Sequence, residues 1–525
     1  MPQLHIEAWV LLALLTYLFV RIVKYTHILT APRYFPRLIS PFTPLGLPGA
    51  LLPASSWTVA GTGFHWSSRF DLYKRGETIQ LTPILGGETS IWTSNIDVAK
   101  QVAVGSHKTS YVKPPFGGLA LLIWGMNLFS ADGSLWRKHR RIVGPAFGNE
   151  LYELVWESTS RIYEDMVESE GWIRNSGGFD VEDMHVLMTK LAFLVISTCG
   201  FGFQSDWLTP TETANETFLS VQQALEIVAT DYMMLIFVPE FILNLPLPRF
   251  IKIRNARAML MGFMLKQVAE RKALIAAGVS NKDAFTLLVK ANEEETGSRV
   301  LDDSELIGNV FLFLFAGHET TARSLTATLA CIALDDEIQT EALDQILEVV
   351  GPDGKPEFED CNKLDKVLAL FYEATRMFPA AHLLLRQATE DNVLLVPKPV
   401  SEEGTIAVPI AKGTTFIVDM VGAQYNPRYF DEPEKFKPSR WHGLPPDSEQ
   451  FTAFSVGSRA CIGRKFATVE AICFLTRFIR DWKVAPLLAP GETREQWRKR
   501  VLDAKVLLAL GIERLPLTLE RRKLA

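Results

Sequence analysis

The stretch with the clearest chemistry lies near the C-terminus, at residues 454–463, and centres on Cys461. Gly457 and Gly463 flank this cysteine, so the backbone can take left-handed or tight turns and approach a flat partner closely. Residues 465–480 follow with helical apolar spacing, which predicts that Cys461 lies just ahead of a helix N-terminus. Free N–H groups and the helix dipole favour a thiolate there. Alone, however, a cysteine before a helix is most often a small buried side chain.

A second stretch, Ala-Gly-His-Glu-Thr-Thr at residues 316–321, interrupts an apolar helical pattern. The helix is predicted to start near Asp302, with Glu305 completing a capping box, and to run to about residue 334. Glycine is costly inside a helix, and a threonine hydroxyl can bond back to a carbonyl and open the turn. We therefore expect a local groove in a buried helix, although a harmless irregularity would give the same pattern.

Two polar sets lie at helical spacing elsewhere. Trp136 and Arg140 stand at i and i+4 in a basic run, and Glu373 and Arg376 stand at i and i+3. Taken alone, each set is typical of a solvated helix surface and indicates no chemistry.

Together these stretches resemble one family. The pattern Phe-x-x-Gly-x-Arg-x-Cys-x-Gly at 454–463 is similar to the haem-ligand loop of the cytochrome P-450 superfamily, the haem-thiolate monooxygenases. Ala-Gly-x-Glu-Thr-Thr is similar to that family's oxygen-activation groove, and the resemblance covers nearly the whole chain. It implies haem b (iron protoporphyrin IX) with Cys461 as the axial iron ligand, which pushes electron density toward bound dioxygen.

The resemblance also implies roles for the other residues. Thr320 would hydrogen-bond dioxygen or its water, Glu319 would relay protons, and His318 has no assigned role. A buried structural set behind the thiolate loop would comprise Glu373, Arg376 and Arg440. The side chains expected to hold the haem propionates are Trp136, Arg140, Arg386 and Arg459.

Lys138 and Arg141 would help to form a positive face for a redox partner. The partner implied by the resemblance is an NADPH-dependent flavoprotein reductase, with cytochrome b5 as a further possibility.

The N-terminal segment 6–23 is apolar and just long enough to span a bilayer if Arg21 snorkels. A cleaved signal peptide is the alternative, but no basic residue precedes the segment and no small-residue cleavage pattern follows. Basic residues follow it, which places the body in the cytosol, and the resemblance implies the endoplasmic reticulum membrane. We predict an anchor at 1–25, a linker at 26–53 whose prolines prevent regular structure, and a catalytic domain at 54–525.

Between these landmarks the pattern predicts a hairpin at 78–94, a helix at 96–104, a strand at 380–387 and a strand–turn–strand around Gly511 at 505–520. Segment 233–248 is apolar and interrupted by prolines, so it is either packed core or a lipid-facing segment. By resemblance, the loop 105–130 roofs the substrate pocket and residues 380–385 line it.

Composition limits the alternatives. The chain of 525 residues has a net charge of −6, which gives no reason to expect nucleic-acid binding. Its five cysteines show no C-x-x-C pairing, so neither a zinc site nor a disulfide framework is indicated. We expect a mainly α fold with a small β region, carried on a single N-terminal transmembrane helix.

The expected function is insertion of one oxygen atom from dioxygen into an apolar substrate. The pattern is similar to fungal microsomal members, which suggests a terpenoid-like secondary metabolite, with xenobiotic aromatics or sterols as the alternative. Three other classes remain open: a haem-thiolate isomerase or dehydratase, a non-catalytic haem protein that binds gases, and a protein that uses the cysteine structurally without haem.

Overall fold

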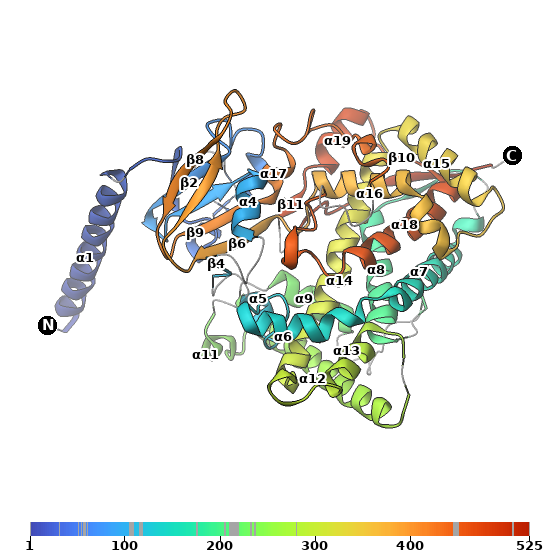
Figure 1. The fold of residues 1–525 in the computed structure, drawn as a ribbon, viewed down its shortest axis with the longest axis horizontal. Coiled ribbons are helices and arrows are strands. Elements are labelled where there is room, and N and C mark those ends of the chain that lie inside the picture. Colours follow the sequence, from blue (N-terminus) through green and yellow to red (C-terminus); the bar gives the residue numbers. More distant parts are fainter. Residues whose placement is uncertain are drawn as a thin grey trace. The chain divides into compact units, whose positions relative to one another are not determined.

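A computed structural model describes residues 2–30, 32–50, 52–53, 55, 59, 61–103, 110–114, 119–174, 177–203, 206–208, 220–231, 234–235, 238–279, 281–444, 451–506 and 509–523. The chain divides into two compact units (Figure 1). The sheet unit comprises Met1–Ala103, Thr109–Val112 and Leu383–Asp431, and the helical unit comprises Val104–Lys108, Lys113–His382 and Glu432–Ala525. The predicted boundaries at 25 and 53 stay predictions.

The sheet unit combines two sheets with one long N-terminal helix and several short helices. Its helices are α1 (Pro2–Thr30), α2 (Leu47–Ala50), α3 (Phe64–Ser67), α4 (Ile96–Ala103) and α17 (Met420–Gln424). Its strands are β1 (Arg37–Phe42), β2 (Thr78–Gly86), β3 (Ser90–Thr93), β4 (Tyr111–Val112), β6 (Leu383–Ala388), β7 (Asn392–Pro397), β8 (Thr405–Ile410) and β9 (Thr415–Asp419). The larger sheet has the order β1-β2-β3-β9-β6-β4, while β7 and β8 form a separate hairpin.

Local patterns predicted most of this unit, with one error. The hairpin at 78–94 is confirmed as antiparallel β2 and β3, and the helix at 96–104 is confirmed as α4. The prediction that the proline-rich segment lacks regular structure is wrong, because β1 runs parallel to β2 within it. Pro41 is tolerated since β1 is an edge strand and its register shifts between Ser40 and Phe42, at the proline.

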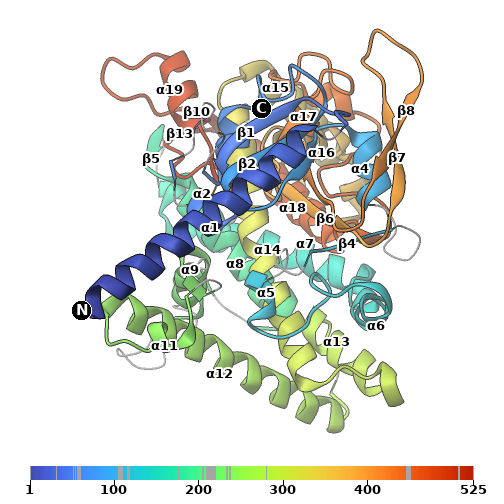
Figure 2. The same ribbon diagram turned by 90° about the vertical axis from the view of Figure 1, so that its left-hand side faces the viewer.

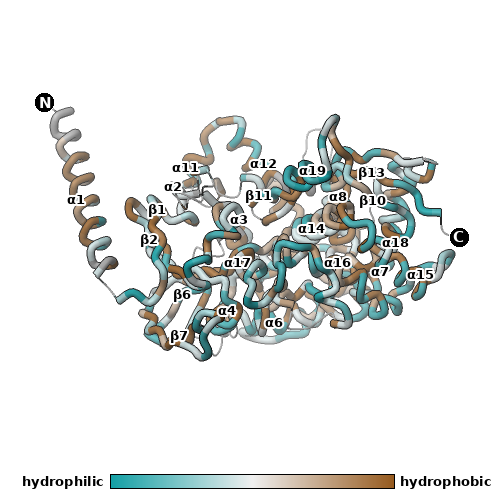
Figure 3. Tube along the Cα trace, turned by 90° about the horizontal axis from the view of Figure 1, so that it is seen from above, coloured by the Kyte–Doolittle hydropathy of each residue, from teal (hydrophilic) through white to brown (hydrophobic). Residues whose placement is uncertain are grey.

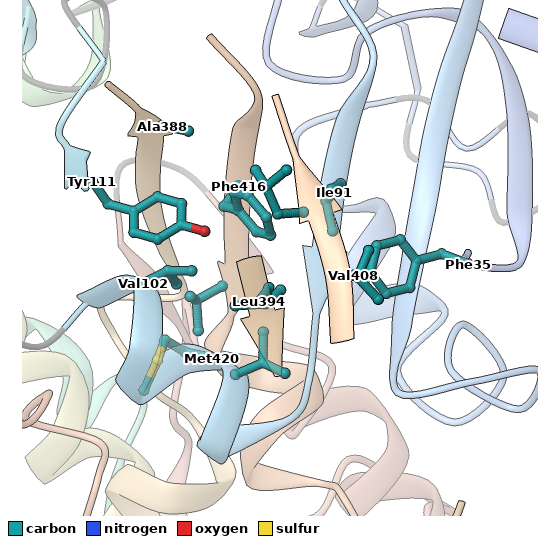
Figure 4. Close-up of a cluster of buried hydrophobic side chains, with 12 residues drawn as sticks. Phe35, Ile91, Val102, Tyr111, Ala388, Leu394, Val408, Phe416 and Met420 are labelled. Carbon is teal, nitrogen blue, oxygen red and sulfur yellow. The ribbon is translucent and has the colours of Figure 1, made fainter. Parts of the chain in front are cut away.

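One hydrophobic cluster joins the sheet to α4 and α17 (Figure 4). Tyr111 and Phe416 meet edge to face with ring centroids 5.4 Å apart, and Val102 and Met420 pack beside them. This cluster fixes β6 and β9, which carry the predicted site residue Arg386.

Figure 3 shows that helix α1 is largely apolar, and its side chains from Ala8 to Val20 are exposed. Its segment Ala8–Thr26 is long and apolar enough to cross a membrane, and none of it is buried. Its far end binds the tip of the β2–β3 hairpin: Arg21 donates to the carbonyls of Pro83 (2.6 Å), Ile84 (2.9 Å) and Gly87 (3.0 Å). Arg21 therefore has protein partners, where the sequence predicted snorkelling to the lipid surface.

The helical unit contains the longer helices. These are α5 (Leu119–Leu122), α6 (Gly133–Val143), α7 (Asn149–Ser169), α8 (Met184–Phe201), α9 (Val221–Thr230), α11 (Glu240–Leu243), α12 (Pro248–Ala276), α13 (Ala284–Glu293), α14 (Asp303–Ile332), α15 (Asp336–Val350), α16 (Asp365–Met377), α18 (Arg464–Asp481) and α19 (Arg494–Val501). Short 3-10 turns are η2 (Gly144–Ala146), η3 (Trp172–Arg174), η4 (Gly297–Arg299), η5 (Phe358–Lys363), η6 (Pro438–Trp441) and η7 (Gly457–Arg459). Its strands are β5 (Phe179–Val181), β10 (Trp482–Pro486), β11 (Lys505–Val506), β12 (Leu510–Gly511) and β13 (Leu517–Arg521).

Helix α14 is the central helix of this unit. The predicted capping box is present, because Asp302 accepts from the Glu305 N–H and Glu305 accepts from the Asp302 N–H. Helix α8 packs along α14 (Figure 2). Although α8 is also apolar enough to cross a membrane, 72% of it is buried, so it is a core helix.

Two other expectations change. Residues 505–520 do not form one hairpin around Gly511: β11 pairs with β12, whereas β13 joins β10 and β5 in another sheet. The described part of 233–248 is mixed: Phe241 is 74% exposed and Leu247 49% exposed, whereas Leu243 is buried.

Candidate active site

The loop around Cys461 closes on itself before α18. The Cys461 N–H donates to the Phe454 carbonyl at 2.9 Å, and Ser455 N–H donates to the Thr452 carbonyl at 2.8 Å. Gly457 has a φ of +71°, as its position in a tight loop requires, and Ser455 has a φ of +64°, which is unusual for a residue with a side chain. Gly463 serves a different purpose, because it is the N-cap of α18 with a negative φ.

Cys461 differs from the other cysteines in exposure. The other four are buried, whereas Cys461 is exposed. Surrounding protein still raises the pKa of its thiol, and a hydrogen bond from the Gly463 backbone and the charges of Arg464 and Arg140 oppose this rise. The expected donors are present, but they do not by themselves favour a thiolate; a bound metal ion would supply the remaining stabilisation.

Helix α14 is continuous from Asp303 to Ile332, and its residues become accessible to solvent over a short window. It is buried from Glu305 to Leu314 and again from Thr321, whereas Ala316 is exposed and Glu319 and Thr320 are partly exposed. The Thr320 hydroxyl donates to the Ala316 carbonyl at 2.8 Å, which is the back-bond expected from the sequence.

His318 points into the packed side of the helix. Its Nδ1 lies 3.0 Å from the Leu314 carbonyl, its ring contacts Phe193, and burial lowers its pKa. Its surroundings are those of a core side chain.

The predicted propionate-binding residues of the helical unit gather around α6. The Arg459 guanidinium lies over the Trp136 ring, 4.5 Å from its centroid, and forms an ion pair with Asp132. Arg140 follows Trp136 by one turn and lies close enough to Cys461 to influence its thiol. Among the described residues Arg140 has no ion pair, so its charge is available to an anion.

Two neighbouring cations are already paired. Lys138 Nζ lies 2.6 Å from Glu305 Oε2, and Arg141 Nε lies 2.6 Å from Glu295 Oε1. The predicted positive face for a redox partner is therefore weaker than the sequence suggests, because acidic residues of the same unit compensate these two charges.

Glu373 is the centre of a fully buried polar cluster. Arg376 binds it through Nε and Nη2, both at 2.9 Å, and Arg440 Nε lies 3.2 Å from it. Trp441 Nε1 and the Lys437 N–H also donate to it, at 2.8 and 3.0 Å. The sequence pattern indicated the arginines but neither of these last two donors.

Arg386 is the one predicted site residue in the sheet unit. It lies on β6, is 7% exposed and donates to the Leu385 carbonyl at 2.8 Å. Its role toward haem stays a prediction, as does pocket lining by residues 380–385. Parts of the predicted roof loop, 105–109 and 115–118, lie outside the described residues.

Sequence reasoning missed two partners of the site. Asp132 forms an ion pair with Arg459, and Arg323 binds Glu319 at 3.0 Å. The i,i+4 spacing of Glu319 and Arg323 could have indicated their pairing. The Asp132–Arg459 pair required the fold, as did the burial of Glu470 on α18 without a hydrogen bond from any described residue.

Comparison with known proteins gives a consistent result. A family model described as cytochrome P-450 matches residues 69–505. Cytochrome P-450 monooxygenase 124 of Postia placenta is 33% identical over 424 residues, covering 80% of this chain and 81% of the relative. Monooxygenase 128 of the same fungus is 29% identical over 487 residues, covering 85% of this chain and 87% of the relative.

A solved zebrafish cytochrome P-450 with progesterone shares the fold with a TM-score of 0.66 at 21% identity, covering 87% of this chain and 98% of that one. Members of this family hold haem, bind an organic substrate and take electrons from a redox partner. The family match over most of the chain, together with the loop around Cys461 and the exposed window of α14, shows that this chain belongs to the cytochrome P-450 monooxygenases.

Proposed function

We propose that this monooxygenase is anchored in the endoplasmic reticulum membrane by α1 and oxidises an apolar, terpenoid-like secondary metabolite. Electrons come from NADPH through a flavoprotein reductase, with cytochrome b5 as a possible second donor. The observation that carries the proposal is Cys461: it is the exposed cysteine among five, in a closed loop directly ahead of α18.

The residues present fit a haem. Cys461 is the iron ligand, and Gly463 donates a backbone hydrogen bond to its thiol. Arg140 offers a propionate an uncompensated charge, while Trp136 and Arg459 form a stacked pair beside it. We assign Arg386 of β6 to the same task.

When bound, the haem supplies an iron centre that activates dioxygen. Thr320 holds a water molecule at the opened window of α14, because its oxygen keeps lone pairs after its hydroxyl has donated to Ala316. Glu319, the neighbouring acid, delivers protons to this water. Glu373, Arg376 and Arg440 have a structural role, since they join α16 to η6.

The substrate class rests on analogy. The relatives from Postia placenta are fungal monooxygenases, which supports a fungal metabolite, and the apolar residues exposed on α1 support access from a membrane. In α11 and the following loop, Phe241 and Leu247 are also exposed, and we assign this segment to the lipid surface. The basic residues after α1 support a cytosolic catalytic domain.

The carbon monoxide complex of the reduced protein tests the ligand. We expect the Soret band of thiolate ligation in the natural protein and its loss in Cys461→Ser, with Cys199→Ser as the control because Cys199 is a buried cysteine. A band typical of histidine ligation would contradict the proposal.

A product screen tests the substrate. The full-length protein is expressed with a reductase and supplied with terpenoids, aromatics and steroids, and products are identified by mass spectrometry. Oxidation of terpenoids with matching NADPH consumption is expected. Conversion of aromatics or steroids alone would contradict the substrate class, and rearrangement without NADPH consumption would indicate an isomerase or dehydratase.

A further inference from the structure

Glu319, the acid assigned to proton delivery, has a partner within its own helix. Arg323 lies one turn further along α14, and its Nε donates to Glu319 Oε1 at 3.0 Å. The Arg323 side chain is 8% exposed and that of Glu319 is 16% exposed, so solvent screens the pair little. The position of the acid therefore depends on where Arg323 lies.

The fold reserves space for this arginine. Gly511 in β12 faces it: a Cβ at Gly511 would lie 2.8 Å from Arg323 Cδ and 2.9 Å from Cγ. These distances are shorter than carbon atoms tolerate, so any side chain at residue 511 would displace the arginine. The close approach of β12 thus fixes Arg323 from the side opposite its own helix.

A histidine on the neighbouring helix α8 belongs to the same cluster. His185 Nδ1 lies 3.0 Å from Thr326 Oγ1, and that hydroxyl donates its own hydrogen to the Ala322 carbonyl at 2.7 Å. The hydroxyl can then only accept, so His185 Nδ1 must carry a hydrogen. In the neutral imidazole the lone pair is therefore on Nε2.

The charges around His185 support this neutral form. The pKa of His185 is lowered to about 4, mainly by burial and also by the positive charge of Arg323, while Asp183 and Glu319 oppose these effects. Arg323 and Glu319 are thus both close enough to His185 to influence its protonation.

One donor in this cluster lacks a partner. Arg323 Nη1 is buried and makes no hydrogen bond to any described residue. A buried N–H of this kind is normally satisfied, by protein or by an ordered water. A water beside Arg323 Nη1 would accept from it and would have its hydrogens free for an acceptor such as His185 Nε2.

We propose that Arg323 and His185 are positioning residues for proton delivery: Arg323 holds Glu319, and the two together hold the water that resupplies its proton. This inference rests on the function proposed above. The step moves one proton from solvent through the bound water to a Glu319 oxygen; the water regains a proton from solvent, and no other bond changes.

Coupling of NADPH consumption to product tests the role of Arg323. Slow proton delivery diverts reduced oxygen to hydrogen peroxide, so we expect Arg323→Leu to lower product per NADPH by about 10-fold, below the full contribution of a general acid. Arg323→Lys keeps the charge and should recover part of the coupling, and Gly511→Ala, which only displaces the arginine, should lower it less. Arg271→Lys is the control, because this buried arginine binds Asp283 and the Phe201 carbonyl.

A second readout does not depend on turnover. Exchange of the histidine C2 hydrogen with deuterium, followed by mass spectrometry over a pH series, reports the protonation of His185 in the full-length protein. In Arg323→Leu the His185 pKa should rise, because a positive charge is removed, whereas Arg271→Lys should leave it unchanged.

The outcomes separate the two proposals. If Arg323→Leu and Gly511→Ala both kept the product yield per NADPH and the His185 pKa of the natural protein, the positioning role would be overturned. The monooxygenase assignment would remain intact. If the natural protein itself lacks the thiolate Soret band, the proposed function fails, and the His185 titration still decides whether Arg323 acts on this histidine.

Discussion

Two buried glutamates of the helical unit have opposite surroundings. Glu373 on α16 accepts from two arginines, a tryptophan and a backbone N–H. Glu470 on α18 is equally buried, yet neither of its oxygens has a hydrogen-bond partner among the described residues, and burial raises its pKa well above the usual value. The comparison teaches that burial alone does not determine how a carboxyl group affects this fold; the donors around it do.

Asp419 in the sheet unit is an intermediate case. It is fully buried and accepts from the Gly422 N–H at 2.9 Å and the Tyr73 hydroxyl at 3.0 Å, but no cation pairs with it among the described residues. Burial raises its pKa to about 6, and these donors oppose the rise. The three carboxyl groups thus form a series: Glu373 accepts from cationic donors, Asp419 accepts from neutral donors, and Glu470 has no donor among the described residues.

The largest effect is expected at Glu373. Glu373→Gln removes the buried negative charge that Arg376 and Arg440 share, so the free energy of unfolding should fall by about 3–5 kcal/mol. Urea unfolding followed by tryptophan fluorescence measures this change, with Glu470→Gln as the matched control. A loss no greater than that of the control would remove the distinction between the two sites.

The next effect appears at Glu470 and depends on pH. The folded-state pKa of this group is raised, so its contribution to stability is complete below the ordinary value of 4.5 and is lost as the pH rises above it. The glutamine of Glu470→Gln cannot ionise. As the pH rises, the free energy of unfolding of the natural protein should therefore fall relative to that of the variant, by up to about 1.4 kcal/mol per pH unit. Unfolding curves at pH 5, 6 and 7 test this; parallel stability profiles would show an unrecognised partner.

The contribution of Asp419 to stability should also fall as the pH rises, but over a narrower range of pH. Its pKa is raised to about 6. The contribution of Asp419 to the free energy of unfolding is therefore complete below pH 3.8, the ordinary pKa of the group, and is lost as the pH rises through 6. Relative to Asp419→Asn, the natural protein should lose about 2 kcal/mol between pH 4 and pH 7 and little above it. The carboxyl infrared band of the natural protein, absent in the variant, gives an independent titration, and a midpoint near pH 4 would be incompatible with this account.

The smallest effect is expected at Trp441. Trp441→Phe keeps most of the ring contact with Tyr372 but removes one of the donors to Glu373, which should lower the free energy of unfolding by about 1 kcal/mol. Since the arginines remain, the loss should be well below that of Glu373→Gln. An equal loss would mean that the indole donor matters as much as the cations.

Local patterns predicted much of the fold because the forces involved are local. The capping box at Asp302, the hairpin at 78–94 and the helix after Gly463 each depend on residues within a few positions of one another. The proline-rich segment was misinterpreted for the same reason: whether Pro41 is tolerated depends on β1 lying at a sheet edge, which is a property of the sheet.

The site shows a similar division. Motifs alone pointed to Cys461, Glu319 and Thr320, whose roles stay predictions, and the back-bond of Thr320 followed from its residue type and position. Long-range partners could not be identified, since Asp132 meets Arg459 across more than 300 residues and Gly511 meets Arg323 through a strand that pairs elsewhere. Such pairs depend on packing, which spacing along the chain does not encode.

The attachment of α1 to the hairpin tip has a consequence for how the protein can change over time. Within the described part of the chain, Arg21 binds main-chain oxygens, those of Pro83, Ile84 and Gly87. This part of the joint depends on the shape of the turn, whereas Lys24 of α1 also pairs with the Glu88 carboxylate at 2.5 Å. The exposed side chains of Ile84 and Leu85 can therefore be exchanged while the end of α1 keeps its place, provided that Arg21, the Lys24–Glu88 pair and Gly87, whose φ is +105°, are retained.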